Sequence, residues 1–235
     1  MADVAASIPG RAPARGQSAG WLRPKYVLFG LIACMYAYVL WHNESFLIRP
    51  NDPEWTHIEP FKWFLLPHGL TAACALFLGP LQFSERLRRR FTKAHRVMGR
   101  FYVGGVLIGA PIGFYIQHFE GVRMYPGDPT SLSFTFAAGA DAAVWMFCTG
   151  MALAMILRGK VEMHRQWMTR SFACALIFLE VRVIDGALGM QNKFDEIIVW
   201  SCVVAAVPLA DLMLQTQEML RRRGTRVSKA AAAGD

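Results

Sequence analysis

Two short runs combine histidine and arginine beside long apolar segments. The first is His95-Arg96-Val-Met-Gly-Arg100, and the second is His164-Arg165-Gln-Trp-Met-Thr-Arg170. An imidazole changes its charge near neutral pH and can ligate a metal, and ionisable groups close to lipid are costly and usually functional. The two runs therefore indicate a cofactor-binding or proton-handling site.

Histidines on different helices at a similar depth can ligate a haem iron, while nearby arginines bind its propionates. We predict His95 and His164 as metal ligands for haem b, with His68 as the next candidate. The predicted cofactor-binding arginines are Arg100, Arg165 and Arg170. The alternative is that each His-Arg pair only anchors the start of a helix at the membrane surface.

The elements that must position these residues follow from the composition, with 54% hydrophobic and 18% charged residues. This composition is typical of a polytopic membrane protein. The apolar segments cover residues 26–41, 61–83, 97–116, 132–157, 167–188 and 197–214. Because lipid offers the backbone no hydrogen bonds, we expect helices. The predicted fold class is all-α, a transmembrane bundle of about six helices.

Basic residues alternate between the two sides of this bundle. Most lie on one side of the predicted crossings, and the other side has only Arg49, Lys62, Arg123 and Lys193. Because basic loops stay cytoplasmic, both termini are expected inside, which predicts a multi-pass protein of the cell inner membrane. The expected domains are a disordered basic tail at 1–24, a transmembrane domain at 25–218 and a basic tail at 219–235.

The net charge of +8 agrees with this topology and does not point to nucleic acid. The expected partner is the lipid bilayer, with a quinone or another membrane subunit as further candidates. The five cysteines form no C-x-x-C pair, so we interpret them as packing residues.

Charged residues inside the segments form a second candidate site. Asp141, Glu180, Arg182 and Asp185 are expected at a depth similar to that of His68. Since a lone charge in hydrocarbon costs at least about 2.5 kcal/mol, these groups should face one another, with Arg182 and Asp185 as an ion pair. The cluster is either a structural pair or a polar pocket that holds an anion and passes protons.

The motifs together resemble a known family. Three stretches are similar to prokaryotic membrane proteins grouped as domain of unknown function 2306. They are the run from His68 to Phe83, the motif His95-Arg96-x-x-Gly99-Arg100-x-Tyr102, and the motif His164-Arg165-x-Trp167-Met168-x-Arg170-Ser171. The resemblance covers about residues 65 to 185. It implies the architecture and the choice of residues but no reaction. A looser analogy connects the chain with b561 and ferric-reductase-type membrane cytochromes, which hold haem between helices.

These observations leave three hypotheses for function. The first is an electron-transfer protein linked to haem b or a quinone. The second is a proton-coupled or small-anion carrier or channel that uses the charged cluster, and the third is an accessory subunit of a membrane complex. The chain has no G-x-S-x-G, H-E-x-x-H or P-loop motif, so the sequence identifies no enzyme class, and whether the protein is an enzyme stays open.

Overall fold

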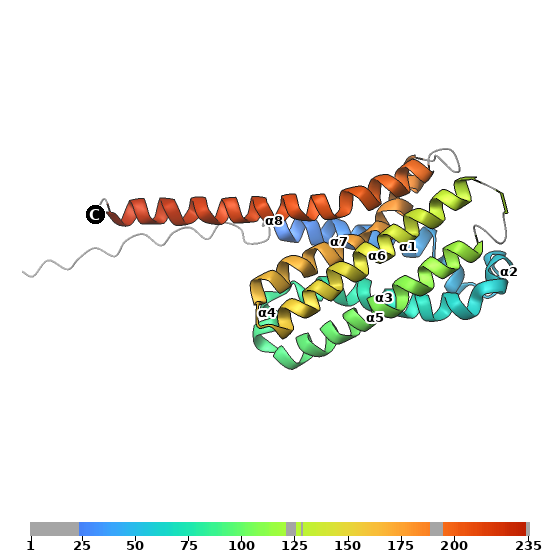
Figure 1. The fold of residues 1–235 in the computed structure, drawn as a ribbon, viewed down its shortest axis with the longest axis horizontal. Coiled ribbons are helices and arrows are strands. Elements are labelled where there is room, and N and C mark those ends of the chain that lie inside the picture. Colours follow the sequence, from blue (N-terminus) through green and yellow to red (C-terminus); the bar gives the residue numbers. More distant parts are fainter. Residues whose placement is uncertain (1–23, 121–125, 128, 189–194, 234–235) are drawn as a thin grey trace, which may run out of the picture.

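The computed structural model describes residues 24–120, 126–127, 129–188 and 195–233, and these residues form helices and turns without a strand. The predicted tail at 1–24 lies outside the described residues, apart from Pro24. Six long helices run through the described part of the chain (Figure 1). They are α1 (Pro24–His42), α3 (Lys62–Gln82), α5 (Thr92–His118), α6 (Pro129–Leu157), α7 (Val161–Leu188) and α8 (Asp195–Ala233). The shorter helices are α2 (Glu54–Ile58), α4 (Glu85–Arg90) and the 3₁₀ turns η1 (Ser45–Ile48) and η2 (Glu59–Phe61).

Each predicted apolar segment overlaps one long helix, which confirms the all-α polytopic bundle. Four stretches have the length and hydropathy of membrane spans: Glu54–Gln82, Thr92–His118, Pro129–Leu157 and Glu196–Arg223. The apolar part of α1, Tyr26–His42, is shorter than these spans. The remaining helix, α7, differs from the four because charged residues such as Arg170, Glu180 and Arg182 interrupt its apolar sequence.

The position of α7 explains how its charges are accommodated. It packs against α6 and α8, and it also contacts α1 and α3. Ionisable side chains are tolerated in membrane helices where they face other helices instead of lipid. The helix whose apolar sequence is interrupted by charges therefore contacts four other helices.

A tight turn joins α6 to α7. Gly159 has a φ of +71°, the left-handed conformation that glycine adopts without strain. The amide of Gly159 donates to the carbonyl of Ile156 at 3.0 Å, and that of Lys160 donates to the carbonyl of Met155 at 2.9 Å. These two bonds form a Schellman motif, which satisfies the last carbonyls of α6. The chain reverses at once, so the start of α7 lies beside the end of α6.

Glycines bring α3 and α5 close together. A Cβ atom at Gly105 would lie 2.6 Å from the backbone oxygen of Thr71, and one at Gly109 would lie 2.7 Å from Thr71 Oγ1. One further turn along, a Cβ atom at Gly113 would lie 2.6 Å from the ring of His68. Small residues at this spacing allow membrane helices to approach closely. The glycine face thus fixes the depth of His68 against α5.

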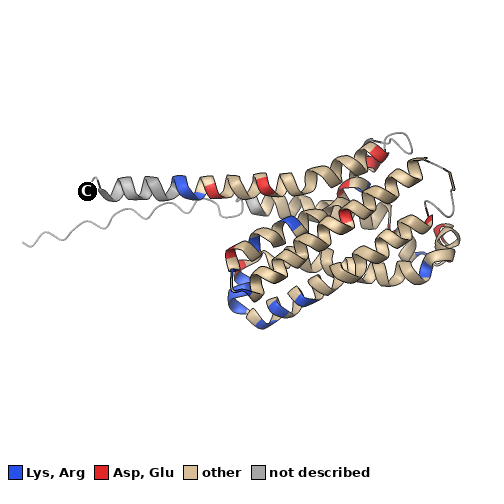
Figure 2. Ribbon diagram, in the orientation of Figure 1, with Lys and Arg blue, Asp and Glu red and all other residues tan. Residues whose placement is uncertain are grey.

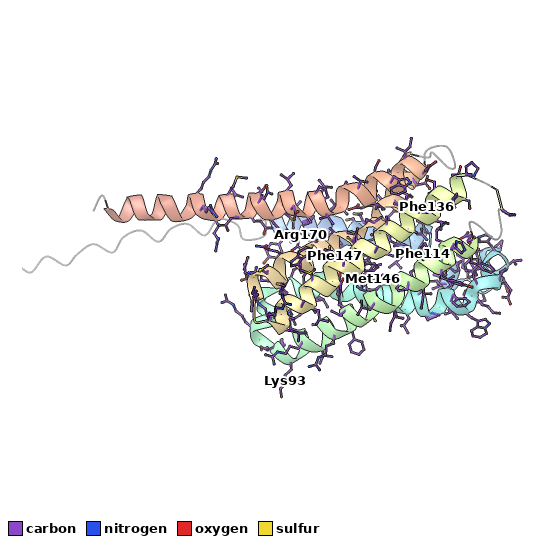
Figure 3. All side chains as sticks on the ribbon, in the orientation of Figure 1. Lys93, Phe114, Phe136, Met146, Phe147 and Arg170 are labelled. Carbon is purple, nitrogen blue, oxygen red and sulfur yellow. The ribbon has the colours of Figure 1, made fainter. Side chains whose placement is uncertain are left out.

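Lysine and arginine gather at one end of the bundle, around α4, the start of α5 and the α6–α7 turn (Figure 2). We call this the basic end and the other the opposite end. Apolar side chains such as Phe136 and Phe147, which are 64% and 59% exposed, cover the outside of the bundle (Figure 3). Helix α8 continues past the basic end to Ala233 (Figure 1), so the predicted domain boundary at residue 218 falls inside a helix.

Candidate functional site

The basic end brings together the two predicted histidines. Helix α5 begins at Thr92 and places His95 in its first turn, while the α6–α7 turn places His164 in the first turn of α7. The two imidazoles are close enough to interact electrostatically. The structure thus places these two candidate ligands together at the basic end, although they come from different helices.

His164 is held in one orientation by the backbone of α6. Its Nδ1 lies 2.8 Å from the carbonyl oxygen of Ala152. Because a carbonyl only accepts hydrogen bonds, Nδ1 of the neutral ring must carry the hydrogen. The lone pair is then on Nε2, which makes no hydrogen bond with a described residue. This is the arrangement usual for a histidine that ligates a metal.

His95 has a different environment. Its Nδ1 is buried and has no hydrogen-bond partner among the described residues, and the same holds for Nε2 of Gln82. Gln82 ends α3 and lies beside Gly99, one turn after His95. Buried polar atoms normally find a partner, so these two atoms leave unused hydrogen-bonding capacity at the basic end.

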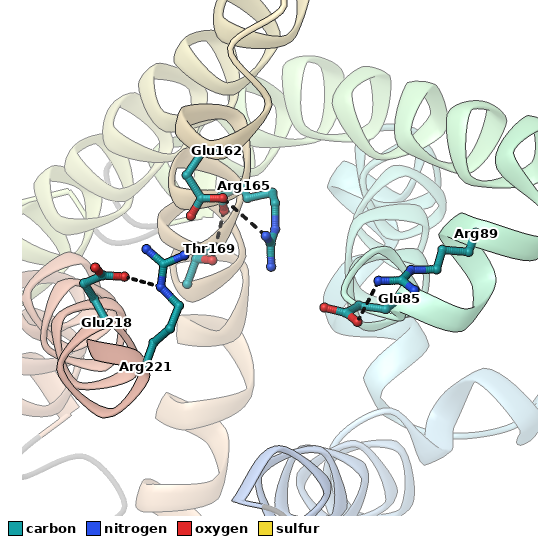
Figure 4. Close-up of polar contacts among 7 residues, drawn as sticks. All are labelled: Glu85, Arg89, Glu162, Arg165, Thr169, Glu218 and Arg221. Atoms are coloured by element: carbon teal, nitrogen blue, oxygen red, sulfur yellow. Dashed lines mark hydrogen bonds and ion pairs between the residues drawn. The ribbon is translucent and has the colours of Figure 1, made fainter. Parts of the chain in front are cut away.

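The arginines within electrostatic reach of His95 differ from those that were predicted to bind the cofactor. Arg88 of α4 and Arg96 are within electrostatic reach of His95. Of the predicted residues, Arg165 lies 3.3 Å from Glu162 (Figure 4) and Arg170 lies 2.6 Å from Asp211. The third, Arg100, is an exposed residue of α5. Arg88 and Arg96 are therefore better placed beside His95.

Other ion pairs at the basic end are exposed. Arg89 and Glu85 are 4.0 Å apart, and Arg221 and Glu218 are 2.8 Å apart (Figure 4). Exposed pairs of this kind contribute about 0–1 kcal/mol to stability. They mark the interfacial surface and do not form a site.

A buried hydrogen-bond network lies deeper in the bundle than the histidines. Tyr102 Oη is 2.8 Å from Ser171 Oγ, and Ser171 Oγ is 2.7 Å from Thr149 Oγ1. The indole Nε1 of Trp145 donates to Tyr102 Oη at 3.4 Å, and Thr149 Oγ1 donates to the Trp145 carbonyl at 2.8 Å. Tyr102, Ser171 and Thr149 have no exposed surface. The network connects α5, α6 and α7, and it was not predicted.

One signal in the sequence could have located this network. Tyr102 follows His95 by seven residues, and Ser171 follows His164 by seven residues. Seven residues are close to two helical turns, so each hydroxyl lies on the same face of its helix as the histidine before it. Both hydroxyls already belong to the two motifs.

The opposite end holds another polar group, with a partner that the sequence did not predict. Arg182 Nε lies 3.4 Å from Glu44 Oε1, and its guanidinium stacks 4.2 Å from the ring of Phe178. Arg182 therefore pairs with Glu44, and the ion pair of Arg182 with Asp185 stays a prediction. Glu44 lies just before η1, so the carboxylate that pairs with Arg182 comes from a loop outside α7.

His68 belongs to this group at the opposite end. Its ring is within electrostatic reach of Arg182 and Glu44, and its Nδ1 lies 2.9 Å from the carbonyl oxygen of Gly109. Gly109 is 14 residues beyond His95 on α5, which corresponds to roughly 21 Å along the helix. His68 therefore cannot share a metal with His95 and His164.

The remaining residues of the predicted cluster are Asp141, Glu180 and Asp185, and each has different surroundings. Asp141 of α6 lies near Cys174 of α7, and its Oδ1 is buried without a hydrogen-bond partner among the described residues. Glu180 lies near Cys202 of α8. Asp185 lies in the last turn of α7, at the opposite end. Asp141 and Glu180 thus have different cysteine neighbours, and a pocket shared by the predicted cluster stays a prediction.

The fold and the distribution of charge define a multi-pass α-helical membrane protein. The chain belongs to the family described as "Predicted membrane protein (DUF2306)", whose model matches residues 65–214. The match confirms the resemblance found in the motifs and extends it into α8. No curated protein and no solved structure matches the chain, so the likeness to b561-type cytochromes has no support beyond the analogy itself.

Proposed function

We propose that this membrane protein takes part in electron transfer and binds haem b at its basic end, between His95 of α5 and His164 of α7. The observation that carries the proposal is the orientation of His164. Its Nδ1 is fixed by the Ala152 carbonyl at 2.8 Å, which leaves the Nε2 lone pair available beside a second imidazole.

The donor set fits a haem better than a bare metal ion. No group of three His, Cys, Asp or Glu side chains able to hold a metal gathers among the described residues. A bare ion usually needs at least three protein ligands, whereas haem iron takes at most two. When bound, haem supplies one-electron chemistry at its iron. His95 and His164 would ligate it, and Arg88 and Arg96 would bind its propionates.

An absorption spectrum of the purified protein tests the proposal, with haem supplied during expression. We expect a Soret band and a sharp reduced α band in the wild type. His95→Ala and His164→Ala should lose the haem but keep a monodisperse folded yield. His118→Ala is the matched control, because His118 is an exposed residue at the far end of α5, and this variant should keep its haem. A haem-free spectrum from folded wild-type protein would disprove haem binding, and would leave a quinone to be tested.

A carrier for protons or a small anion is the second candidate function, and the group at the opposite end favours it. Arg182, Glu44 and His68 place a cation, a carboxylate and an imidazole together. In this hypothesis Arg182 holds the anion and His68 passes protons. Proteoliposomes would show a flux that Arg182→Met abolishes. Lys62→Met is the control, since Lys62 is a basic residue of the same region that pairs with Glu59.

We further propose that the protein lies in the inner membrane with its basic end in the cytoplasm. The concentration of Lys and Arg at that end supports this orientation by the positive-inside rule (Figure 2). A reporter that is active only in the cytoplasm should work when it is fused after Asp235. Activity of a reporter that requires the opposite side would reverse the assignment.

A further inference from the structure

Asp141 is a buried carboxylate that forms no ion pair or hydrogen bond with another described residue. It lies 12 residues after the start of α6 at Pro129 and 16 before the end at Leu157. At 1.5 Å per residue these intervals are roughly 18 and 24 Å, so the side chain lies near the middle of the membrane. Its Oδ1 is buried and makes no hydrogen bond with a described residue.

A charged carboxylate is unfavourable at this position. None of the described charged side chains of α5, α7 or α8 forms an ion pair with Asp141, and the titratable group that faces it is the thiol of Cys174. Without a cation or hydrogen-bond donors, an ionised carboxylate in hydrocarbon costs several kcal/mol, whereas the protonated acid is neutral. The site therefore favours a protonated carboxyl group over an ionised carboxylate that binds a metal cation.

We propose that Asp141 is a proton-binding site in the middle of the membrane, and that it exchanges its proton with the basic end through the network of Tyr102, Ser171 and Thr149. The proton moves from water at the basic end to a carboxylate oxygen of Asp141, and each hydroxyl on the way accepts one hydrogen and gives up another. Nothing is oxidised or reduced. This proposal does not depend on a haem or on the carrier hypothesis.

The connection towards the basic end follows one interior face of each helix. Thr149 lies three residues before Ala152, whose carbonyl binds His164. Tyr102 and Ser171 lie two turns from His95 and His164 on α5 and α7. Polar groups thus continue from the histidine pair into the buried network, and a water molecule between them would complete the path.

The connection towards Asp141 uses the next turn of α6 and of α7. Trp145 follows Asp141 by four residues and donates to Tyr102 Oη at 3.4 Å. Cys174, which is within electrostatic reach of Asp141, follows Ser171 by three residues. Residues at these spacings are neighbours on one helix face. The carboxyl and the network are therefore one turn apart.

The first buried side chains of α6 and α7 beyond Asp141 towards the opposite end are apolar. The first carboxylate beyond Cys174 on α7, Glu180, lies near Cys202 of α8. Towards the opposite end, the fully or nearly fully buried neighbours are Ala137 of α6 with Ile177 and Leu179 of α7, which are 0%, 5% and 1% exposed. Farther out, Thr135 Oγ1 is already bonded to the Ser131 carbonyl at 3.1 Å. Apolar packing offers no donors or acceptors for a proton. We therefore infer that Asp141 exchanges its proton with one side of the membrane only.

Labelling with dicyclohexylcarbodiimide tests whether Asp141 is protonated. This lipid-soluble reagent reacts with protonated carboxyl groups in apolar surroundings, and peptide mapping by mass spectrometry locates the adduct. We expect Asp141 to be labelled in folded wild-type protein and in the Glu180→Gln control, and the adduct to be absent from Asp141→Asn. An unlabelled Asp141 in folded protein, across the acid to neutral pH range, would overturn the proposal.

Infrared spectroscopy tests the path. The carboxyl C=O band that is lost in Asp141→Asn should shift when D₂O replaces water. Tyr102→Phe, which removes only the hydroxyl, should slow this shift several-fold, while the control Tyr115→Phe at an exposed position of α5 should not. Equal exchange rates in wild type and Tyr102→Phe would disprove the path. In proteoliposomes, a proton flux across the membrane that requires Asp141 would disprove one-sided access.

Discussion

Replacing Asp211 by leucine is expected to lower the free energy of unfolding by about 3 kcal/mol, because the change leaves a buried guanidinium without its carboxylate. Arg170 Nε lies 2.6 Å from Asp211 Oδ1, and the Arg170 side chain is only 19% exposed. The stacking of Arg170 on Trp167, at 4.7 Å, does not replace the lost charge. Thermal unfolding of the detergent-purified variants measures the effect.

The reverse substitution and the double substitution serve as controls. Arg170→Met should cost less, about 1–2 kcal/mol, because Asp211 is 38% exposed and can reach polar surroundings. The double variant with methionine and leucine should be closer to the wild type than Asp211→Leu, since it leaves no unpaired charge. If the double variant is the least stable of the three, the loss of stability does not come from an unpaired charge, and the expectation is wrong.

The second large effect is expected at the glycine face between α3 and α5. In Gly105→Ala, the added Cβ atom would lie 2.6 Å from the backbone oxygen of Thr71, so α3 must move away. Overpacking of this kind costs about 1–3 kcal/mol. Because the same face positions His68 against Gly109 and Gly113, we also expect the imidazole of His68 to shift.

Gly104→Ala is the matched control, since it makes the same chemical change at the adjacent residue. A Cβ atom at Gly104 would have nothing within 4 Å. Alanine also favours a helix over glycine by up to about 1 kcal/mol, so this variant should be neutral or slightly stabilised. Equal unfolding temperatures for the two variants would show that α3 and α5 are not in tight contact at Gly105.

The helices could be predicted from the sequence because lipid leaves an apolar segment of about twenty residues few alternatives to a helix. The end of α8 could not be predicted in this way. The apolar run stops at Leu214, whereas the helix continues to Ala233. Beyond the run the helix carries Arg221 and Arg222, which bond Glu218 on the preceding turn. Such local pairing is compatible with a helix that leaves the bundle.

The candidate site was predicted only in part, and the reason differs between residues. His95 and His164 stand out because they begin helices beside basic loops. The partner of Arg182 is Glu44, 138 residues away, and no local spacing can indicate such a contact. Ser171 and Thr149 resemble ordinary small packing residues, and only the seven-residue spacing from the histidines distinguishes Ser171.

The tight turn between α6 and α7 also bears on how the protein is made. Helix α7 contains Arg170, Glu180 and Arg182, so its insertion into lipid by itself is costly. The Schellman motif at Gly159 lets α7 follow α6 directly, and the two helices can leave the translocon as one hairpin with the α7 charges facing protein. The turn that brings His164 to Ala152 thereby also gives this charged helix a route into the membrane.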